Sequence, residues 1–351
     1  MRNLYCRIFI ILLISSLFVL YNDCGYGENK AKTDLLIAGD WGDKAGEFGI
    51  YEGDKIPEKY GVLDLIITKE EIYILDALNS RIQVFDLDGK FKKIIKFAKK
   101  WEGFGLAWGF TLYKNNFYML IGIAPSYYST RGFQEIHQFS YDGKFIKKFG
   151  KAYLQGHKKH PDTEFSYYYN ILSDANKGYL VCRSSYEMLA FDAQGNMKYN
   201  ILDIIGKKSF AYSLRGIDSY GNLVINKFRR HTDDENTIIY DVNTRTIKSE
   251  VSGRFDHVDN KGNFYLIRTY RPKRDNPDLV TEITKYDSKT KTTSKLEISG
   301  DVKIIKSGKE KLFHYRSNYS VTEISKVDPE GNIYHLIALE DGVLLRKITL
   351  K

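Results

Sequence analysis

The sequence predicts an all-β protein in which six four-stranded antiparallel sheets form a ring, the architecture of a six-bladed β-propeller. Three observations lead to this fold class. Short alternating strands recur in six copies, most copies carry Gly-containing turns, and an N-terminal strand replaces the one strand that the sixth copy lacks. The composition agrees, because 27 tyrosines and 20 phenylalanines with only 6 prolines favour pleated sheet.

The best-formed copy covers residues 62–97. Its four strand-like segments are VLDLII at 62–67, EIYIL at 71–75, RIQVFD at 81–86 and KFKKIIKF at 90–97. An Asp-Gly pair separates the last two segments, and Asp-Gly between alternating strands is a strong hairpin signal. We therefore expect four antiparallel strands, A to D, in this order.

Five further copies follow the same plan. Their opening strands and turns are FTLYKNNFYMLI at 110–121, ILSDANKGYLVCR at 171–183, GIDSYGNLVIN at 216–226, FDHVDNKGNFYLIR at 255–268 and ISKVDPEGNIYHLI at 324–337. The sixth copy ends after its third strand, GVLLRKITL at 342–350, and DLLIAGDWG at 34–42 supplies a matching fourth strand. Pairing the two chain ends in one sheet closes the ring and protects strand edges that would otherwise invite aggregation.

The segments GEFG at 46–49 and GVLDLIITKEEIYILDALNSRIQVFDLDGKF at 61–91 resemble an NHL repeat. Through them the chain resembles the bacterial six-bladed propellers built from such repeats, over about residues 33–351. The resemblance implies the fold more than a function, and a pair of β-sandwiches is the rival architecture. Within the repeat we interpret Asp76, Asn79 and Arg81 as structural residues that fix the connection between strands B and C by local hydrogen bonds.

The first 27 residues form a separate segment. Arg2 and Arg7 precede the apolar run IFIILLISSLFVL at 8–20, which is short for a membrane span and typical of a signal peptide. We expect cleavage after Gly27, so that residues 28–351 form the propeller; lipidation at Cys24 is the second choice, and an uncleaved anchor is the third. The sequence thus predicts a secreted, periplasmic or cell-envelope protein that meets a membrane only through this segment.

The net charge indicates the class of partner, and the cysteine content indicates how many thiols the exported chain has. The net charge is +9, and it becomes +8 once residues 1–27 are removed. A basic exported protein attracts an anionic saccharide, peptide or protein surface, and we expect no nucleic acid partner. Cys182 is the one cysteine beyond residue 27, in the apolar stretch GYLVC, and is expected to be a buried, unreactive thiol. We expect a monomer.

Loop lengths predict which face binds. In this topology the A–B and C–D turns lie on one face, and they are short throughout. The opposite face carries the insertions, which are rich in Arg, Lys, His and Tyr, and insertions in repeat proteins often mark the binding face. From these loops we select Arg229, Arg271, Tyr127, Tyr128, Tyr167, Tyr168 and Tyr169 as candidates for anion binding and stacking.

Three successive repeats place a cation at the end of strand B: Arg183, Lys227 and Arg268. Like charges side by side are unfavourable without a counter-charge. Either an anionic ligand is held between them, or acidic loop residues neutralise them; the loop candidates are Asp162, Glu164, Asp233, Asp234 and Asp275. Arginine binds carboxylate and phosphate through paired hydrogen bonds, which fits the first alternative.

An enzyme is the alternative function. Six-bladed propellers include metal-dependent lactonases and a zinc lyase, so the alternative is a divalent-metal hydrolase or lyase at the central channel. Its metal candidates are His157 and His160 in HKKH, Asp256 and His257, with Asp64 as a further channel carboxylate. No nucleophile motif or phosphate-binding loop accompanies them. The sequence therefore favours a binding protein without a cofactor, with a divalent cation as the one exception considered.

Overall fold

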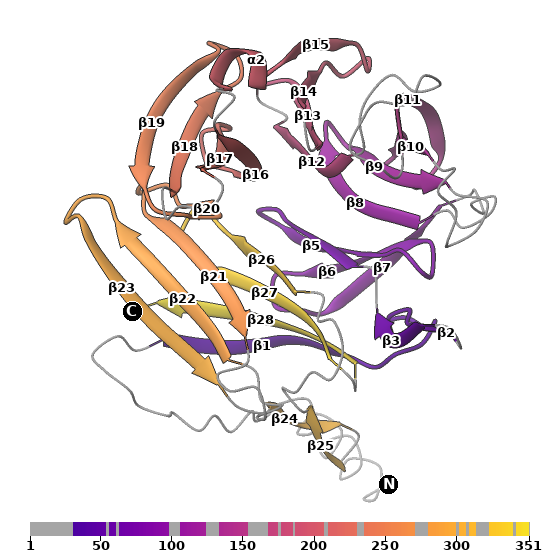
Figure 1. Ribbon diagram of the computed structural model, residues 1–351. Helices are drawn as coiled ribbons and strands as arrows, with labels where there is room; N and C mark the ends of the chain where they lie inside the picture. The colour runs from indigo at the N-terminus through magenta and orange to yellow at the C-terminus, as the bar shows by residue number, and fades with distance from the viewer. Residues whose placement is uncertain are drawn as a thin grey trace, which may run out of the picture.

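A computed structural model describes residues 31–53, 56–60, 63–97, 106–123, 133–153, 168–174, 177–184, 187–206, 210–229, 235–270, 280–299, 302–306, 309–313, 323–339 and 342–350. Six four-stranded antiparallel sheets surround a common centre, as the sequence predicts (Figure 1). In each sheet the strands run from strand A near the centre to strand D at the rim.

The first three blades follow the chain order. Blade 1 contains β4 (Leu63–Ile67), β5 (Glu71–Asp76), β6 (Arg81–Asp86) and β7 (Phe91–Lys96). Blade 2 contains β8 (Leu106–Tyr113), β9 (Asn116–Ile123), β10 (Phe133–Ser140) and β11 (Phe145–Tyr153). Blade 3 contains β12 (Tyr168–Asp174), β13 (Tyr179–Ser184), β14 (Met188–Phe191) and β15 (Met197–Asn200), and the one-turn helix α2 (Leu202–Ile205) follows it.

The last three blades complete the ring. Blade 4 contains β16 (Ala211–Ile217), β17 (Leu223–Phe228), β18 (Glu235–Asp241) and β19 (Thr246–Ser252). Blade 5 contains β20 (His257–Val258), β21 (Phe264–Tyr270), β22 (Val280–Asp287) and β23 (Thr292–Ser299). Blade 6 contains β26 (Glu323–Val327), β27 (Ile333–Leu339), β28 (Gly342–Leu350) and β1 (Ala31–Gly39). Two hairpins lie outside the blades: β2 (Tyr51–Gly53) with β3 (Ile56–Tyr60), and β24 (Val302–Lys306) with β25 (Lys309–Phe313).

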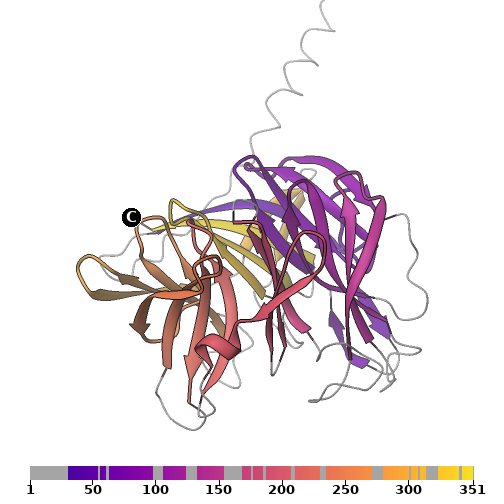
Figure 2. The same ribbon diagram turned by 90° about the horizontal axis from the view of Figure 1, so that it is seen from above.

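The predicted closure of the ring is confirmed. Strand β1 pairs antiparallel with β28, from Ala31 opposite Leu350 to Gly39 opposite Val343. In the turned view of Figure 2, indigo β1 again lies beside the yellow strands of the last blade. The inner strands also contact one another in a closed order, β4 to β8, β12, β16, β20, β26 and back to β4. Both ends of the propeller therefore belong to one blade, and the ring has no open seam.

The apolar core lies between neighbouring blades rather than at the centre. Among the described residues, each of the six junctions contains a cluster of buried side chains drawn from both blades. At the junction of blades 4 and 5, for example, Val224 and Ile239 pack against Phe264 and Leu266. Successive residues of a strand face opposite sides of the sheet, so each blade buries both faces only when neighbours cover them.

Asp-x-x-Gly-Asn turns connect the inner two strands of blades 4, 5 and 6. In blade 4, Asp218 Oδ1 accepts hydrogen bonds from the backbone N–H groups of Tyr220 at 2.9 Å and Asn222 at 2.7 Å. Its Oδ2 accepts from Asn222 Nδ2 at 2.8 Å, and Gly221 has a φ of +73°, in the region that favours glycine. Short self-contained turns of this kind leave this face of the ring without insertions.

Asp76, Asn79 and Arg81 have the structural role that the sequence predicts. Asp76 Oδ2 accepts hydrogen bonds from Arg81 Nε at 2.7 Å and Asn79 Nδ2 at 2.9 Å, across the strand B to strand C connection of blade 1. They also bind the segment that leads from β1 into blade 1, because Asp76 Oδ1 accepts from the Gly49 N–H at 2.9 Å and Arg81 donates to the Glu47 carbonyl at 2.7 Å. The motif thus fastens the closing strand to the first blade.

Across the described residues, no helix has the length and apolar character needed to cross a membrane. Residues 1–27, which carry the predicted signal peptide, lie outside them.

Candidate functional site

Arg183, on β13, is held inside the protein framework. Its Nε and Nη2 atoms donate to the Tyr212 carbonyl of β16 at 3.0 and 2.5 Å, and its Nη1 donates to the Glu187 carbonyl at 3.3 Å. The guanidinium therefore joins blade 3 to blade 4.

Lys227, on β17, has an acidic partner within its own blade. Its ammonium group donates to Glu250 Oε1 at 2.8 Å and lies 4.8 Å from the centre of the Phe210 ring. Arg229, which is exposed, lies over the same ring at 5.3 Å. Lys227 is thus neutralised by a strand residue, while the loop acids proposed from the sequence lie outside the described residues.

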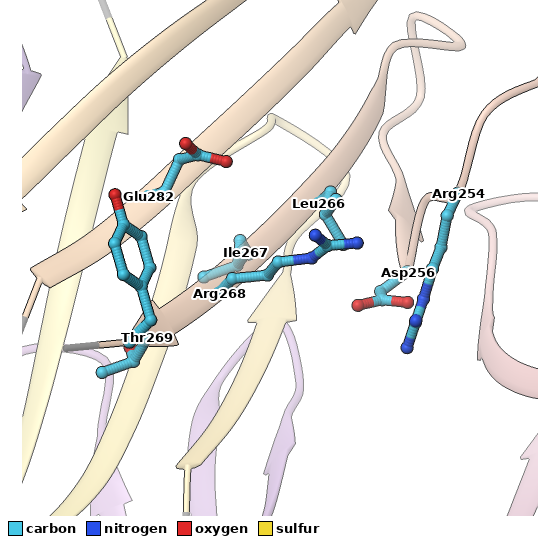
Figure 3. A pocket seen from close by; sticks show the side chains of 8 residues that line it. Arg254, Asp256, Leu266, Ile267, Arg268, Thr269 and Glu282 are labelled. Carbon is cyan, nitrogen blue, oxygen red and sulfur yellow. The ribbon is translucent and has the colours of Figure 1, made fainter. Parts of the chain in front are cut away.

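Arg268, on β21, lines a pocket of about 570 Å³. The pocket lies on the surface of blade 5 that faces blade 4, because Leu266 in its wall packs with Val224 and Ile239 of blade 4. Its lining residues are Arg254, Asp256, Leu266, Ile267, Arg268, Thr269, Tyr270 and Glu282 (Figure 3). The volume falls in the range of small-molecule sites.

Asp256 is the acidic centre of this pocket. Its Oδ1 lies 3.3 Å from Arg215 Nε of β16 and accepts a hydrogen bond from Asn226 Nδ2 at 3.4 Å. Burial raises the pKa of Asp256, and the positive charges of Arg215, Arg254 and Arg268 only partly offset that effect. One carboxylate therefore faces three guanidinium groups.

Two of these guanidinium groups lack direct partners. Within the part of the chain that the structure describes, Arg254 and Arg268 form no hydrogen bond or ion pair through their side chains, and the buried Arg254 Nε has no hydrogen-bond acceptor. Arg215 Nε is close to Asp256 Oδ1, but the two atoms do not have the geometry of a hydrogen bond. Figure 3 shows Arg254 and Arg268 approaching Asp256 from opposite sides. Buried donors without acceptors are costly, so the part of the pocket around Asp256 has both excess positive charge and unused hydrogen-bonding capacity.

A second group of polar side chains lies where the inner strands meet. Asp64 accepts hydrogen bonds from the backbone N–H groups of Phe110 at 3.0 Å and Leu65 at 2.8 Å, and burial raises its pKa while Lys326 acts against this. Burial and the nearby charge of Lys326 lower the pKa of His257 to about 3, so its imidazole is neutral. Asp64 and His257 thus share a lysine neighbour, whose charge disfavours a divalent cation between them.

The metal candidates do not form a cluster in the described part of the chain, where no group of three or more His, Cys, Asp or Glu side chains could hold a metal ion. Asp256 faces arginines and His257 faces Lys326. His157 and His160 lie outside the described residues.

The remaining predicted residues are placed as follows. Tyr168 and Tyr169 belong to the first half of β12, where Tyr168 pairs with Ser184. Tyr127, Tyr128, Tyr167 and Arg271 lie outside the described residues.

Reasoning from the sequence missed Arg215 and Arg254. An alignment of the inner strands would have found the first, because Arg215 and Asp256 each stand three residues before the aspartate that opens the A–B turn, Asp218 and Asp259. Equivalent positions in neighbouring blades lie side by side, so an Arg and an Asp there predict an ion pair across the junction. No comparable signal marks Arg254, which lies in the connection between β19 and β20.

Comparisons with known proteins give matches only among solved structures. No protein-family model matches the chain, and no curated protein matches it. An oligogalacturonate lyase from Vibrio parahaemolyticus shares 10% identity over 80% of this chain and 75% of its own, with a TM-score of 0.48. A putative exported protein from Bacteroides fragilis shares 12% identity over 92% of this chain and 95% of its own, at 0.42. A DUF4221 member from Bacteroides vulgatus shares 12% identity over 96% of this chain and 98% of its own, at 0.44.

Such identities inform on fold alone. The description of this chain as a six-bladed β-propeller therefore rests on its own strand pairing.

Proposed function

We propose that this chain is an exported six-bladed propeller that binds an anionic ligand in the pocket formed by Arg254, Asp256 and Arg268. One observation carries the proposal: Arg254 and Arg268 line this pocket without a partner among the described residues, and a single carboxylate lies between them and Arg215. A carboxylate or phosphate group would supply the missing acceptors, and arginine binds both groups through paired hydrogen bonds.

The wall of the pocket suits a ligand larger than a bare ion. Leu266 and Ile267 offer apolar contact, and Tyr270 offers a ring beside Thr269. A pocket of about 570 Å³ accommodates an acidic monosaccharide or a short peptide end, in which a few polar groups set orientation and apolar atoms provide contact area. Arg229, Arg271 and the tyrosines at positions 127, 128 and 167–169 would extend this surface toward a larger partner.

In this proposal Arg183 and Lys227 stabilise the protein near the pocket and do not contact the ligand. Arg183 orders the edge of blade 4 that carries Tyr212, and Lys227 pairs with Glu250, so neither offers a free cation to a ligand without rearrangement. Among the three aligned cations, Arg268 is the one with direct access to the pocket.

Two further assignments belong to the proposal. The apolar run at 8–20 after Arg2 and Arg7 supports an export signal in residues 1–27, with Cys24 lipidation as the second choice. The hydrogen-bonded Asp76, Asn79 and Arg81 support a relationship to NHL-repeat propellers, because the repeat-like segment carries these residues and they have a structural role.

Calorimetric titration of residues 28–351 with glucuronate, acetate and phosphate tests the anion site. We expect glucuronate or acetate to bind in a salt-dependent manner, and Arg268→Gln to weaken binding about ten- to a hundredfold, the equivalent of losing one or two charge-assisted hydrogen bonds. Lys289→Gln is the matched control, since Lys289 is an exposed cation on the β22–β23 turn, away from the pocket. Equal affinities for wild type and Arg268→Gln, or an absence of binding by all three anions, would refute the proposal.

A further inference from the structure

Arg268 and Glu282 lie directly opposite each other on β21 and β22, on the surface that forms the pocket. Opposite charges at such positions normally meet, because cross-strand neighbours stand about 5 Å apart at Cβ. Among the described residues no ion pair joins them. The Arg268 side chain instead extends toward Asp256, while Glu282 lies on the far side of Arg268 from Asp256 and Arg254 (Figure 3).

The end of the pocket around Glu282 is acidic. Glu282 faces Glu297 across β22 and β23, and Tyr270 donates its hydroxyl to Glu297 Oε1 at 3.0 Å. The cation that Glu282 approaches is Lys295, at 3.5 Å, whose side chain is 64% exposed. An exposed pair at that distance is weak, so a ligand cation can replace the lysine at little cost.

The pocket is therefore bipolar. Arg254 and Arg268, with Arg215 behind Asp256, make one end positive, while Glu282 and Glu297 make the other end negative. The walls between the two ends include the apolar side chain of Leu266. A simple anion would use the positive end only, and the acidic end would repel any second negative charge.

We propose that the pocket binds an extended zwitterion, an ω-amino carboxylate whose carboxylate contacts Arg254 and Arg268 and whose ammonium group contacts Glu282. This inference rests on the anion-binding function proposed above and names its ligand class. The methylene chain would lie against Leu266 and the Tyr270 ring. A ligand whose carboxylate contacts Arg254 must pass the Arg268 side chain to reach Glu282, because Arg268 lies between these two residues (Figure 3). This order favours a ligand with separated charges.

Three commercially available probes separate the charges: 6-aminohexanoate, hexanoate and glycine. We expect wild-type residues 28–351 to bind 6-aminohexanoate about tenfold more tightly than hexanoate, the gain from one additional charge-assisted contact, and more tightly than glycine. Because this comparison uses one protein and matched ligands, it does not depend on how any variant folds.

Two variants test which end of the pocket contacts the ammonium group and which end contacts the carboxylate. Glu282→Gln is expected to abolish the preference for 6-aminohexanoate over hexanoate. Hexanoate itself should bind at least as tightly as to wild type, because the variant removes a negative charge near the anion site. Arg268→Gln is expected to weaken both ligands, and Lys289→Gln neither. Thermal unfolding of each variant verifies that the pocket remains folded.

The outcomes distinguish this inference from the function on which it rests. If wild type binds hexanoate and 6-aminohexanoate equally and both depend on Arg268, the anion site stands and the zwitterion inference is wrong. If glycine binds as tightly as 6-aminohexanoate, an extended ligand is excluded. If neither carboxylates nor phosphate bind, or if Arg268→Gln binds them as tightly as wild type does, both proposals are wrong.

Discussion

Replacing Asp76 by Asn tests how strongly the closing strand is fastened to blade 1. Asp76 is fully buried and Arg81 is 3% exposed, so their contact at 2.7 Å is an ion pair inside the protein. The same carboxylate accepts hydrogen bonds from Asn79 and from the Gly49 backbone. Asparagine keeps the shape and one acceptor oxygen, but it removes the charge and turns an amide N–H toward the Arg81 and Asn79 donors.

The loss should be large because Arg81 stays buried. Its other hydrogen bonds go to backbone carbonyl oxygens, at 2.9 Å to Lys44 and 2.7 Å to Glu47, and these do not neutralise it. Breaking a buried pair by removing one partner typically costs about 3–5 kcal/mol. We expect Asp76→Asn to lower the free energy of unfolding by this amount.

Equilibrium unfolding of residues 28–351 in urea measures the change. Asp287→Asn is the matched control: Asp287 also accepts backbone hydrogen bonds, from Lys289 and Thr290 at 2.9 Å, but it lies in an outer turn and has no buried cation beside it. If Asp76→Asn lowers the free energy of unfolding by less than about 1 kcal/mol, its effect is no larger than that of an ordinary surface substitution. That result would contradict the view that the Asp76–Arg81 pair holds the closing strand to blade 1.

Three further predictions follow from individual side chains. Because burial raises the Asp256 pKa, lowering the pH toward that pKa should neutralise its carboxylate. The site then loses a negative charge that competes with the ligand, so anion binding should tighten. Asp256→Asn should bind more tightly at pH 7 and lose this dependence in titrations between pH 8 and 5. Burial alone would raise the Glu71 pKa, but hydrogen bonds from Lys92 and two tyrosine hydroxyls lower it from 4.5 to about 2. Wild type should therefore melt above Glu71→Gln at pH values over 4.5, and the difference should disappear as the pH falls toward 2. Burial raises the pKa of Cys182, so a thiol reagent should fail to modify native residues 28–351 and should label one thiol after unfolding in urea.

The fold was predictable because its signals are local. Alternating apolar residues and glycine-containing turns specify each hairpin within a few residues, as at Asp86 to Lys90, where the turn and its backbone hydrogen bonds appear as expected. The pairing of β1 with β28 joins residues about 300 positions apart, but counting strands predicts it, since the sixth copy lacked one. The contacts of Arg81 with residues 44 and 47 carried no such signal, because they join a motif to an irregular segment.

The site was only partly predictable, for a geometric reason. The sequence places Arg183, Lys227 and Arg268 near one end of their strands. Which residue each side chain contacts depends on the face of the sheet to which it points and on the distance to the neighbouring blade. Arg183 meets the Tyr212 carbonyl and Lys227 meets Glu250, whereas Arg268 meets a pocket. Repeat alignment cannot separate these three outcomes, since the partners lie on different strands in each case.

The pocket forms beside the shortest inner strand of the propeller. The inner strand of blade 5, β20, has two residues, and it pairs with β21 only at His257 with Tyr265 and Val258 with Phe264. Blade 4 has seven residues in the equivalent strand, β16. The chain preceding β20 therefore leaves the sheet, and Arg254 and Asp256 enter the junction as side chains of a connection, although the Asp256 N–H still donates to the Tyr265 carbonyl at 2.8 Å.

Beside this short strand, the polar side chains of Arg254, Asp256 and Arg268 lie next to the apolar cluster that joins blades 4 and 5. A propeller whose blades all packed fully would offer no such opening between two blades. We infer that the shortness of β20 leaves room for the pocket at this junction. Extending β20 by restoring an alternating apolar pattern at residues 254 and 256 should abolish anion binding, because it removes Arg254 from the pocket and places apolar side chains beside Arg268. Retention of binding in such a variant would show that the ligand does not enter this junction.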